Sequence, residues 1–448
     1  MIKQIFDLHI HSKYSRACSR DLELPKIAVA CGRKGVDICA TGDFTHPAWF
    51  SHIKDCLEEI GGSGLYRLKD TSPPARLASE SVAGRPPPPY QGEGEREVKF
   101  ILSTEISCIY KHKDATRRLH LVILAPNLAA VEKFNEKLVD LGCNIRSDGR
   151  PIVGLSGKEI LRILLDIDKR FMLIPAHAWT PWFSVFGSKS GYDSLEECFE
   201  ELTPHIKAIE TGLSSDPTMN RRLSALDNIT LVSNSDAHSP DKIGREANVF
   251  CFNNESDIAY DEITRIISTG DKNKFLYTIE FFPEEGKYHF DGHAPCAVCL
   301  APEESKKEHY LCPKCKKKLT IGVLSRVEEL ADRAEKNIVK ENFIPHKYIV
   351  PLRQIIASVF GVGEGSKRVA AEYESIIKKI GNEFFTLIDA PTEEIKKEAT
   401  DENIALAIAN MRAGKILVFP GFDGVFGRFD LLSNKTKLAP NQGRLWRE

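Results

Sequence analysis

The chain has 448 residues, 42% of them hydrophobic and 28% charged, and its 61 basic and 63 acidic residues give a formal net charge of -2. This composition is typical of a globular protein of two or three domains. It excludes a strongly basic protein that coats nucleic acid, although a local basic face is compatible with it. The sequence has no run of about eighteen apolar residues and no signal-peptide pattern, so we expect a cytoplasmic protein that does not contact membranes.

Short apolar runs alternate with helix-like segments up to about residue 270. The expected strands cover residues 4–10, 37–41, 99–106, 119–124, 170–175, 206–211, 230–233 and 248–252. The expected helices between them include residues 128–141, 158–166, 194–202 and 216–225. Because the order is repeatedly strand then helix, we predict an α/β fold with parallel strands in an open or barrel-shaped sheet.

Residues 61–97 interrupt this alternation, because they are rich in proline, glycine and serine and contain few apolar residues. We predict a disordered insertion there. After Gly270, a β-rich stretch at residues 275–291 leads to four clustered cysteines, and the pattern from residue 323 onward is mainly helical. We therefore expect a first domain at 1–290, a small cysteine module at 291–322 and a helical domain at 323–448.

The first strand ends in Asp7-Leu8-His9-Ile10-His11. Alternation along a strand puts His9 and His11 on one face, so both imidazoles can reach a single ion, although such a pair can also be two partly exposed histidines. The pattern recurs near the ends of later strands, at Asp43, His46, Glu105, His120, His177, Asp236 and His238. Histidine with carboxylate is the ligand set of a hydrolytic zinc or manganese site, and so many candidates suggest two or three ions.

The order His-x-His, Asp/His, Glu, His, His, Asp-x-His resembles the polymerase and histidinol phosphatase (PHP) family over roughly residues 1–290. The resemblance implies a distorted (β/α)7 barrel, followed here by the cysteine module and the helical domain. It also implies that one ion is held by His9, His11, Glu105 and Asp236. Glu105 would bridge to a second ion held by His120 and His177. We expect Asp236, Glu105 and His177 to be catalytic, and Asp43 and Glu210 to orient the histidines.

A third ion of the family would use His46 and His238. The family's further ligand, a His or an Asp, is missing, because Arg16, Ala17 and Cys18 occupy its positions. Cys18 could substitute as a soft ligand, Asp21 could reach the ion, or the site could be weak and completed by water.

The segment Pro175-Ala176-His177-Ala178-Trp179-Thr180-Pro181-Trp182-Phe183 resembles the endonuclease Q family, the DNA-repair branch of the PHP group. Residues 15–19, 186–191 and 235–240, the cysteine module and the helical tail match the same layout. The resemblance implies a metal-dependent endonuclease that nicks double- or single-stranded DNA 5′ to hypoxanthine, uracil, xanthine or an abasic site. Zn²⁺ would occupy the barrel and the cysteine module, with Mg²⁺ or Mn²⁺ as alternatives for activity.

Such an enzyme needs the damaged nucleotide to leave the base stack and enter a pocket. Trp179, Trp182 and Phe183 follow the candidate ligand His177 and are candidates for flanking that base, because aromatic faces stack on any base. The plain alternative is that these rings pack the mouth of the barrel.

Four cysteines form two Cys-x-x-Cys pairs, Cys296 with Cys299 and Cys312 with Cys315, separated by twelve residues. Two such knuckles predict one structural zinc with four thiolates, whereas a pair of redox dithiols would not require two equal pairs. Residues 306–318 contain six lysines, Lys314, Lys316 and Lys317 among them, and one glutamate. This patch could neutralise DNA phosphates, or it could be a solvated loop.

Residues 352–377 have the pattern of a helix, a glycine turn and a second helix. Gly363 and Gly365 would expose backbone N–H groups beside Lys367 and Arg368, so this helix-hairpin-helix-like segment could hold a DNA phosphate. A tight connection between two helices explains the glycines equally well.

Two other functions are compatible with the same barrel. One is a phosphomonoesterase like histidinol phosphatase, although the appended modules have no evident use in an enzyme of that kind. The other is a non-catalytic DNA-binding factor, which the missing third-ion ligand suggests. Damaged DNA is the expected partner and the nucleoid the expected place of action. A sliding clamp is a further candidate partner, although residues 440–448 carry no clear docking motif.

Overall fold

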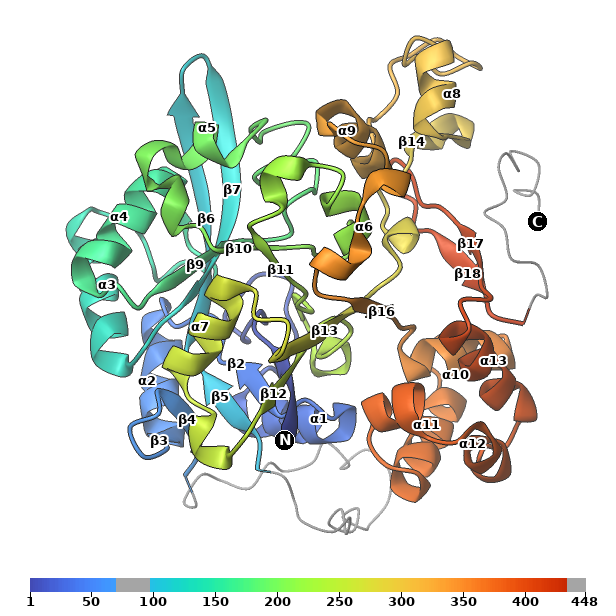
Figure 1. The fold of residues 1–448 in the computed structure, drawn as a ribbon, viewed down its shortest axis with the longest axis horizontal. Helices are drawn as coiled ribbons and strands as arrows, with labels where there is room; N and C mark the ends of the chain where they lie inside the picture. Colours follow the sequence, from blue (N-terminus) through green and yellow to red (C-terminus); the bar gives the residue numbers. More distant parts are fainter. Residues whose placement is uncertain (70–96, 433–448) are drawn as a thin grey trace.

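The computed structural model describes residues 1–69 and 97–432, which form a mixed α/β fold (Figure 1). The largest sheet has eight strands in the order β16-β13-β12-β1-β2-β5-β4-β3. These strands are β1 (Ile2–Asp7), β2 (Ile38–Ala40), β3 (Leu57–Glu59), β4 (Leu65–Leu68), β5 (Lys99–Ile101), β12 (Ala247–Phe252), β13 (Phe275–Glu280) and β16 (His346–Tyr348).

A second sheet has four strands in the order β8-β6-β7-β9, and β10 pairs with β11 in a separate two-stranded sheet. These strands are β6 (Ser103–His112), β7 (Ala115–Leu124), β8 (Ile152–Val153), β9 (Met172–Pro175), β10 (Ala208–Glu210) and β11 (Thr230–Val232). The eight strands expected from the apolar runs are therefore all present. Outside these strands, a parallel bridge joins Ile10 to Ala237. The segments that follow β1 and β11 therefore lie side by side.

The prediction of parallel strands is only partly correct. The pairs β1–β2, β2–β5 and β10–β11 are parallel, but β1–β12, β6–β7 and β7–β9 are antiparallel. Only Lys113 and Asp114 separate β6 from β7. A turn of two residues can join only antiparallel strands, because a parallel pair needs a longer crossover connection. The pairing of the described residues forms separate sheets, so a closed (β/α)7 barrel stays a prediction.

Seven α-helices precede residue 270 in the described part of the chain. They are α1 (Leu24–Lys34), α2 (Pro47–Cys56), α3 (Leu128–Asp140), α4 (Gly157–Ile167), α5 (Leu195–Phe199), α6 (Pro217–Asn220) and α7 (Tyr260–Thr269). Helix α4 shows why they form: Ser156 and Glu159 make a capping box, and Ile160, Leu161 and Leu164 bury one face. The predicted helices at 194–202 and 216–225 are shorter than expected, each followed by a 3-10 segment.

The predicted insertion at 61–97 begins with ordered structure, because β4 pairs with β3 and β5. That start is therefore a strand, and the rest of the segment, residues 70–96, lies outside the described residues.

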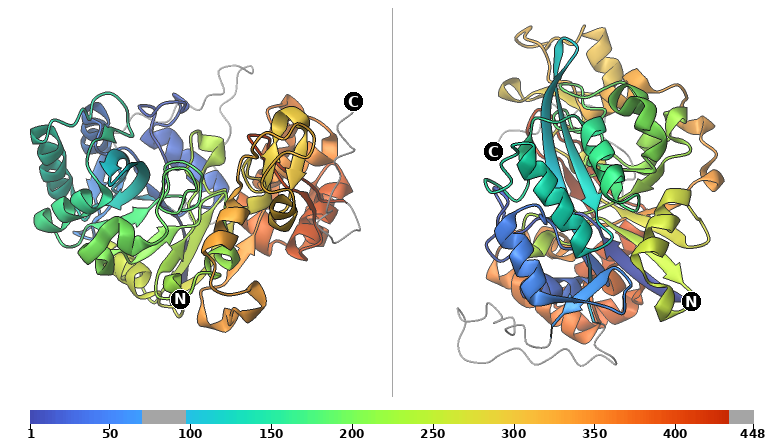
Figure 2. Two further views of the ribbon diagram at one scale, coloured as in Figure 1. Left: turned by 90° about the horizontal axis from the view of Figure 1, so that it is seen from above. Right: turned by 90° about the vertical axis from the view of Figure 1, so that its left-hand side faces the viewer.

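The second half of the chain adds a small cysteine region and a group of helices. Its strands are β14 (Asp291–His293), β15 (Val298–Leu300), β17 (Leu417–Phe419) and β18 (Arg428–Asp430). Its helices are α8 (Pro302–Lys307), α9 (Val323–Leu330), α10 (Leu352–Phe360), α11 (Lys367–Lys379), α12 (Thr392–Glu398) and α13 (Glu402–Arg412). Helices α3 and α4 lie at one end of the molecule and α10–α13 at the other (Figures 1 and 2).

The helical region is tied to the large sheet. Strand β16 pairs with β13, and the buried Lys34 forms a 2.7 Å ion pair with Glu383. The domain boundaries at 290 and 322 remain our proposal. Among the described helices, none combines the length and the apolar character that crossing a bilayer requires.

The link after β13 contains a carboxyl group that should make stability depend on pH. Burial, and to a lesser degree Asp216, raises the pKa of Glu284 from its ordinary 4.5 to about 7, and Glu284 Oε2 is buried without a hydrogen-bond partner. The folded state therefore binds more protons than the unfolded state between these two values, so stability falls as pH rises through this window.

We expect Glu284→Gln to raise the melting temperature by roughly 2–4 °C at pH 8 and to leave it unchanged near pH 4. Glu303→Gln, which removes an exposed carboxylate from α8, is the control and should change neither value. Thermal unfolding of the three proteins at both pH values measures this. Equal melting temperatures of Glu284→Gln and the parent at pH 8 would show that ionisation of Glu284 does not lower the stability of the folded state.

Candidate metal centre

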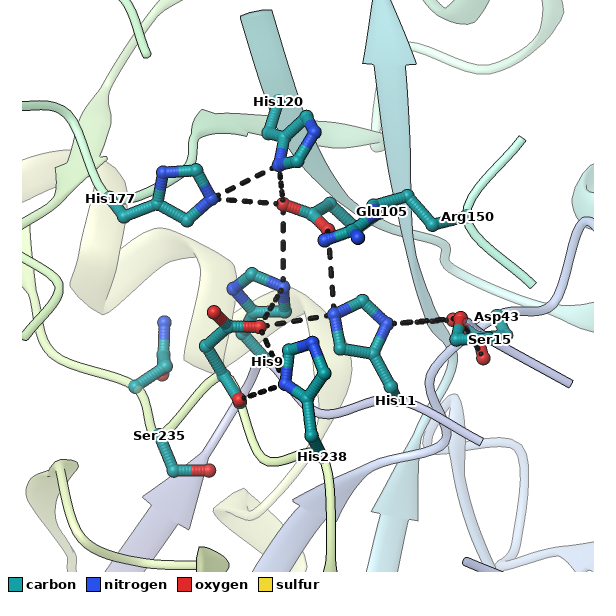
Figure 3. Close-up of polar contacts among 12 residues, drawn as sticks. His9, His11, Ser15, Asp43, Glu105, His120, Arg150, His177, Ser235 and His238 are labelled. Atoms are coloured by element: carbon teal, nitrogen blue, oxygen red, sulfur yellow. Dashed lines mark hydrogen bonds and ion pairs between the residues drawn. The ribbon is translucent and has the colours of Figure 1, made fainter. Parts of the chain in front are cut away.

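Six of the eight predicted barrel ligands lie together, although they come from five separate segments of the chain (Figure 3). His9 and His11 follow β1, Glu105 lies in β6, His120 in β7, His177 follows β9 and Asp236 follows β11. They form two groups, in each of which the ligand atoms lie within 4.8 Å of one another. The first is His9, His11, Glu105 and Asp236, and the second is Glu105, His120 and His177.

The first group surrounds a buried nitrogen that has no protein partner. His11 Nε2 lies 3.0 Å from Asp236 Oδ1 and 3.4 Å from Glu105 Oε2. His9 Nε2 lies 3.7 Å from Asp236 and 3.8 Å from Glu105, and it is buried without a hydrogen bond. A buried orphaned imidazole nitrogen between two carboxylates fits a divalent cation.

The second group converges on the other oxygen of the same carboxylate. Glu105 Oε1 lies 2.9 Å from His120 Nδ1 and 3.2 Å from His177 Nε2, and those two nitrogens are 3.1 Å apart. Two imidazoles and one carboxylate oxygen are a donor set that zinc or manganese accepts. Glu105 therefore takes part in both groups: Oε1 lies nearest His120 and His177 and is 3.8 Å from His9 Nε2, while Oε2 faces His11.

The predicted orienting residues contact the histidines at Nδ1, the ring nitrogen that points away from the ligand cluster. Glu210 lies 3.0 Å from His9 Nδ1, and Asp43 lies 3.1 Å from His11 Nδ1. Ser12 and Ser15 donate to Asp43 at 2.6 and 2.8 Å, which holds its carboxylate in place. A carboxylate behind each Nδ1 favours a proton on that nitrogen, so Nε2 faces the cluster and can give its lone pair to a cation that binds there.

Three residues of the site have positive φ angles, which side chains other than glycine rarely adopt: Asp43 at 47°, His177 at 29° and Asp236 at 47°. Gly212 packs against His177 so closely that a Cβ there would lie 2.5 Å from the histidine Cβ. Such backbone strain is held only where the surroundings enforce it, and it often marks functional sites.

The carboxylates are electrostatically stabilised as anions. Burial raises the pKa of Glu105, but His120, Arg150 and His9 outweigh it and lower the pKa well below its ordinary value. Burial likewise opposes ionisation of Asp236, while His11 and His9 lower its pKa below the usual range. Both groups are therefore negative at neutral pH and available to a cation.

The proposed third-ion ligands do not form a group in the described part of the chain. His46 stacks on Tyr14 with 4.3 Å between ring centroids, and His238 Nδ1 lies 2.8 Å from the backbone oxygen of Asp236. Burial, with Asp43 and Asp236, raises the pKa of Cys18 to about 12, so its thiolate is disfavoured. A bound cation would itself deprotonate a coordinating thiol, so Cys18 as a third-ion ligand stays a prediction.

Arg150, which no sequence motif singled out, also reaches the site. Its Nη1 donates to Glu105 Oε2 at 3.0 Å. A single arginine in a loop has no recognisable pattern, and its place becomes evident only when β8 pairs with β6.

The three candidate pocket residues differ in their surroundings. The prediction for Trp179 is wrong, because this ring is 1% exposed, donates to Asn220 Oδ1 at 2.8 Å and packs on Phe186, so a base cannot reach it. Trp182 is 37% exposed and meets Tyr288 edge to face, and Phe183 contacts the ring of His120. Trp182 and Phe183 therefore remain candidates.

The candidate ligand group at the cysteine cluster differs from the predicted four-thiolate set, which stays a prediction. His293, Cys296, Cys312 and Cys315 form a ligand group, whereas Cys299 lies outside it with its Sγ 3.9 Å from the backbone oxygen of Pro420. Cys299 pairs with Gly292 in the β14–β15 hairpin. His293 and Cys296 have the same x-x spacing as Cys312 and Cys315, so a His-x-x-Cys pattern could have been found in the sequence. The donors are those of a Cys₃His zinc site.

The remaining basic candidates lie near this cluster and at the helical turn. Lys314 donates to the backbone oxygen of Cys296 at 2.7 Å, Lys316 lies 3.9 Å from Glu308, and Lys317 is exposed. The predicted helix, turn and helix are present as α10 and α11, with exposed Gly363, Gly365, Lys367 and Arg368 between or at their ends. The guanidinium of Arg368 lies over the ring of Phe360.

Comparisons with known proteins cover nearly the whole chain. Residues 351–415 match the MJ0043 C-terminal domain family. The uncharacterized protein MJ0043 of Methanocaldococcus jannaschii is 34% identical over 264 residues, which are 58% of this chain and 32% of that protein, so the match spans about a third of that relative. The uncharacterized protein YqxK of Bacillus subtilis is 28% identical over 95% of this chain and 99% of that protein.

Two solved structures match nearly the whole chain. One is the lesion-specific endonuclease PfuEndoQ from Pyrococcus furiosus, with a TM-score of 0.79 and 30% identity over 97% of this chain and 98% of that one. The other is endonuclease Q in complex with a 27-mer duplex that has an abasic lesion at the active site, with a TM-score of 0.78 and 31% identity over 96% of each chain.

The ligand set of the cysteine cluster can be tested directly. We expect His293→Ala to lose about one metal ion per chain, because three thiolates leave the tetrahedral shell open, and Cys299→Ser to keep it. Elemental analysis of both purified variants and of the parent measures this. Loss of the ion from Cys299→Ser with retention in His293→Ala would restore the four-thiolate set.

Proposed function

We propose that this chain, which belongs to the endonuclease Q family and is therefore an endodeoxyribonuclease, uses its two ligand groups to cut damaged DNA. The observation that carries the proposal is the pair of groups joined at Glu105, found in a chain that matches a lesion-specific endonuclease from end to end. The complex of a relative with an abasic duplex supports an abasic site as one substrate. We extend the proposal to hypoxanthine, uracil and xanthine, with the nick on the 5′ side of the lesion.

When bound, divalent ions would supply Lewis acidity, which polarises a phosphoryl oxygen and acidifies a water molecule. In the proposed roles, His9, His11, Glu105 and Asp236 hold one ion and Glu105, His120 and His177 hold the other. Zinc suits both donor sets, with Mn²⁺ or Mg²⁺ as alternatives. Glu210 and Asp43 keep the protons of His9 and His11 on Nδ1, so that the Nε2 lone pairs face the cluster.

Exposure indicates the side from which a phosphate approaches. The side chains of His9, His11 and Glu105 are at most 2% exposed, whereas Asp236 and Arg150 are each 24% exposed and His238 is 34% exposed. The scissile phosphate therefore meets the cluster beside these three residues. Asp236 both holds an ion and borders the substrate, which makes it the carboxylate whose loss should cost most.

The DNA contacts that we propose lie around this side. Trp182 and Phe183 would flank the extruded nucleotide, and the lysines of the cysteine module and the turn at Gly363 and Gly365 would hold phosphates further along the duplex. We propose the nucleoid as the place of action. A sliding clamp finds no support in the relatives, and residues 440–448 lie outside the described residues.

Replacement of Asp236 tests whether the barrel ligands are the catalyst. We expect Asp236→Asn to slow nicking of a duplex with one abasic site by at least about 10²-fold, because it removes a ligand beside the phosphate. The matched control is Asp241→Asn, an exposed carboxylate five positions along the chain, which should nick at the parental rate.

End-labelled duplexes that contain a single abasic site, hypoxanthine or uracil measure the rate and map the nick to the nucleotide. Nicking by Asp236→Asn at the parental rate would remove the cluster from the chemistry. Nicking of no lesion by the parent, together with turnover of a small phosphate monoester, would replace the endonuclease by a phosphomonoesterase.

Trp182 is the proposed pocket residue that can be changed without touching a ligand. We expect Trp182→Ala to retain its metal content and to lose most of its preference for lesion over undamaged duplex, since one base–aromatic stack is worth about 1–3 kcal/mol. Phe385→Ala, which truncates a similarly exposed ring in the helical region, is the control. Unchanged discrimination by Trp182→Ala would assign the ring to packing against Tyr288.

A further inference from the structure

The loop that joins α3 to β8 brings one fixed positive charge into the metal centre. Arg150 Nη1 donates to Glu105 Oε2, the oxygen that also lies 3.4 Å from His11 Nε2. The side chain is 24% exposed, so it contacts the cluster and solvent at once. Figure 3 shows the guanidinium beside Glu105, close to His11.

The backbone on both sides of Arg150 is anchored to the site. Gly149 N donates to Tyr14 O at 3.0 Å, and a Cβ on Gly149 would lie 2.3 Å from Asp43 Oδ2, so only glycine can approach the carboxylate this closely. On the other side, Ser107 N donates to Pro151 O at 3.0 Å, which ties the loop to β6 two residues beyond Glu105. The position of Arg150 relative to Glu105 is therefore set by the fold and not by a flexible surface loop.

The same loop runs past the residues that a third ion would need. Asp148 accepts a hydrogen bond from the backbone N–H of Arg16 at 3.3 Å. Arg16 occupies one of the positions at which the family has its further ligand. His46 is covered by Tyr14, and neither His46 nor His238 belongs to a ligand group among the described residues. The side of the cluster without a complete third ligand set is thus the side on which Arg150 stands.

We propose that the guanidinium of Arg150 contacts a non-bridging oxygen of the scissile phosphate and supplies there the positive charge that a third cation would otherwise provide. A guanidinium suits this role because it has five donors in a planar fork, is always charged, and can bind a phosphate oxygen while one N–H stays on Glu105. Arg150 is then a catalytic residue that links the Glu105 carboxylate, which both ligand groups share, to the substrate. This inference rests on the proposed phosphodiester chemistry.

Binding of inorganic phosphate to the metal-loaded protein tests the inference without any DNA. We expect Arg150→Gln to weaken phosphate binding about ten- to a hundredfold, with Arg150→Lys in between, and to leave the metal content per chain unchanged. The matched control is Arg16→Gln, which removes an equal charge that is bonded to Asp148 but is 80% exposed and makes no contact with Glu105. Its phosphate affinity should stay within about twofold of the parent.

Calorimetric titration with phosphate and elemental analysis of the same samples separate the outcomes. Unchanged phosphate affinity in Arg150→Gln would overturn the inference. Metal loss in parallel with phosphate loss would overturn it too, because Arg150 would then only hold Glu105 in place. An equal loss of phosphate affinity in Arg16→Gln would show that Arg150 acts through the overall positive charge near the site and not through a direct contact with phosphate. Because the probe is free phosphate, the effect of Arg150→Gln on phosphate binding can be measured even if the parent nicks no lesion. Failure of the parent to nick any lesion would contradict the proposed function only.

Discussion

A buried carboxylate that contacts three histidines and an arginine is the interaction on which the site depends. Glu105 is fully buried, and an isolated carboxylate in that position would be costly. His11, His120 and His177 approach its oxygens at 2.9–3.4 Å, and Arg150 at 3.0 Å. The charge is tolerated because these cationic or metal-binding partners surround it, and the strands and loops that supply them are coupled through one residue.

The fold meets this requirement by ending several strands at the same place. The segments after β1, β9 and β11 reach the centre from loops, while Glu105 and His120 enter from the antiparallel hairpin β6–β7. The hairpin lets two ligands face one another across neighbouring strands, and the loops supply the rest with positive φ angles at His177 and Asp236. A rigid sheet and a few strained loops together give ligand distances that neither would produce alone.

The sequence predicted the centre better than its surroundings, for physical reasons. Ligand types are limited to a few residues and lie at strand ends, so His9, His11, Glu105, His120, His177 and Asp236 could be named in advance. Arg150 could not, because its place depends on the β6–β8 pairing. Two equal Cys-x-x-Cys pairs are the more familiar pattern, so the sequence points to Cys299 before His293. Trp179 was misassigned because burial is a tertiary property that aromatic type does not reveal.

Glu105 belongs to both candidate ligand groups, and metal content measures directly whether it joins two metal sites. We expect Glu105→Gln to lose about two metal ions per chain together, since each ligand group then lacks its anionic oxygen. Glu246→Gln, which changes a buried carboxylate outside both groups, should keep the parental content and serves as the control. Elemental analysis of the two variants and the parent decides it. Loss of a single ion, or of none, from Glu105→Gln would contradict the shared centre.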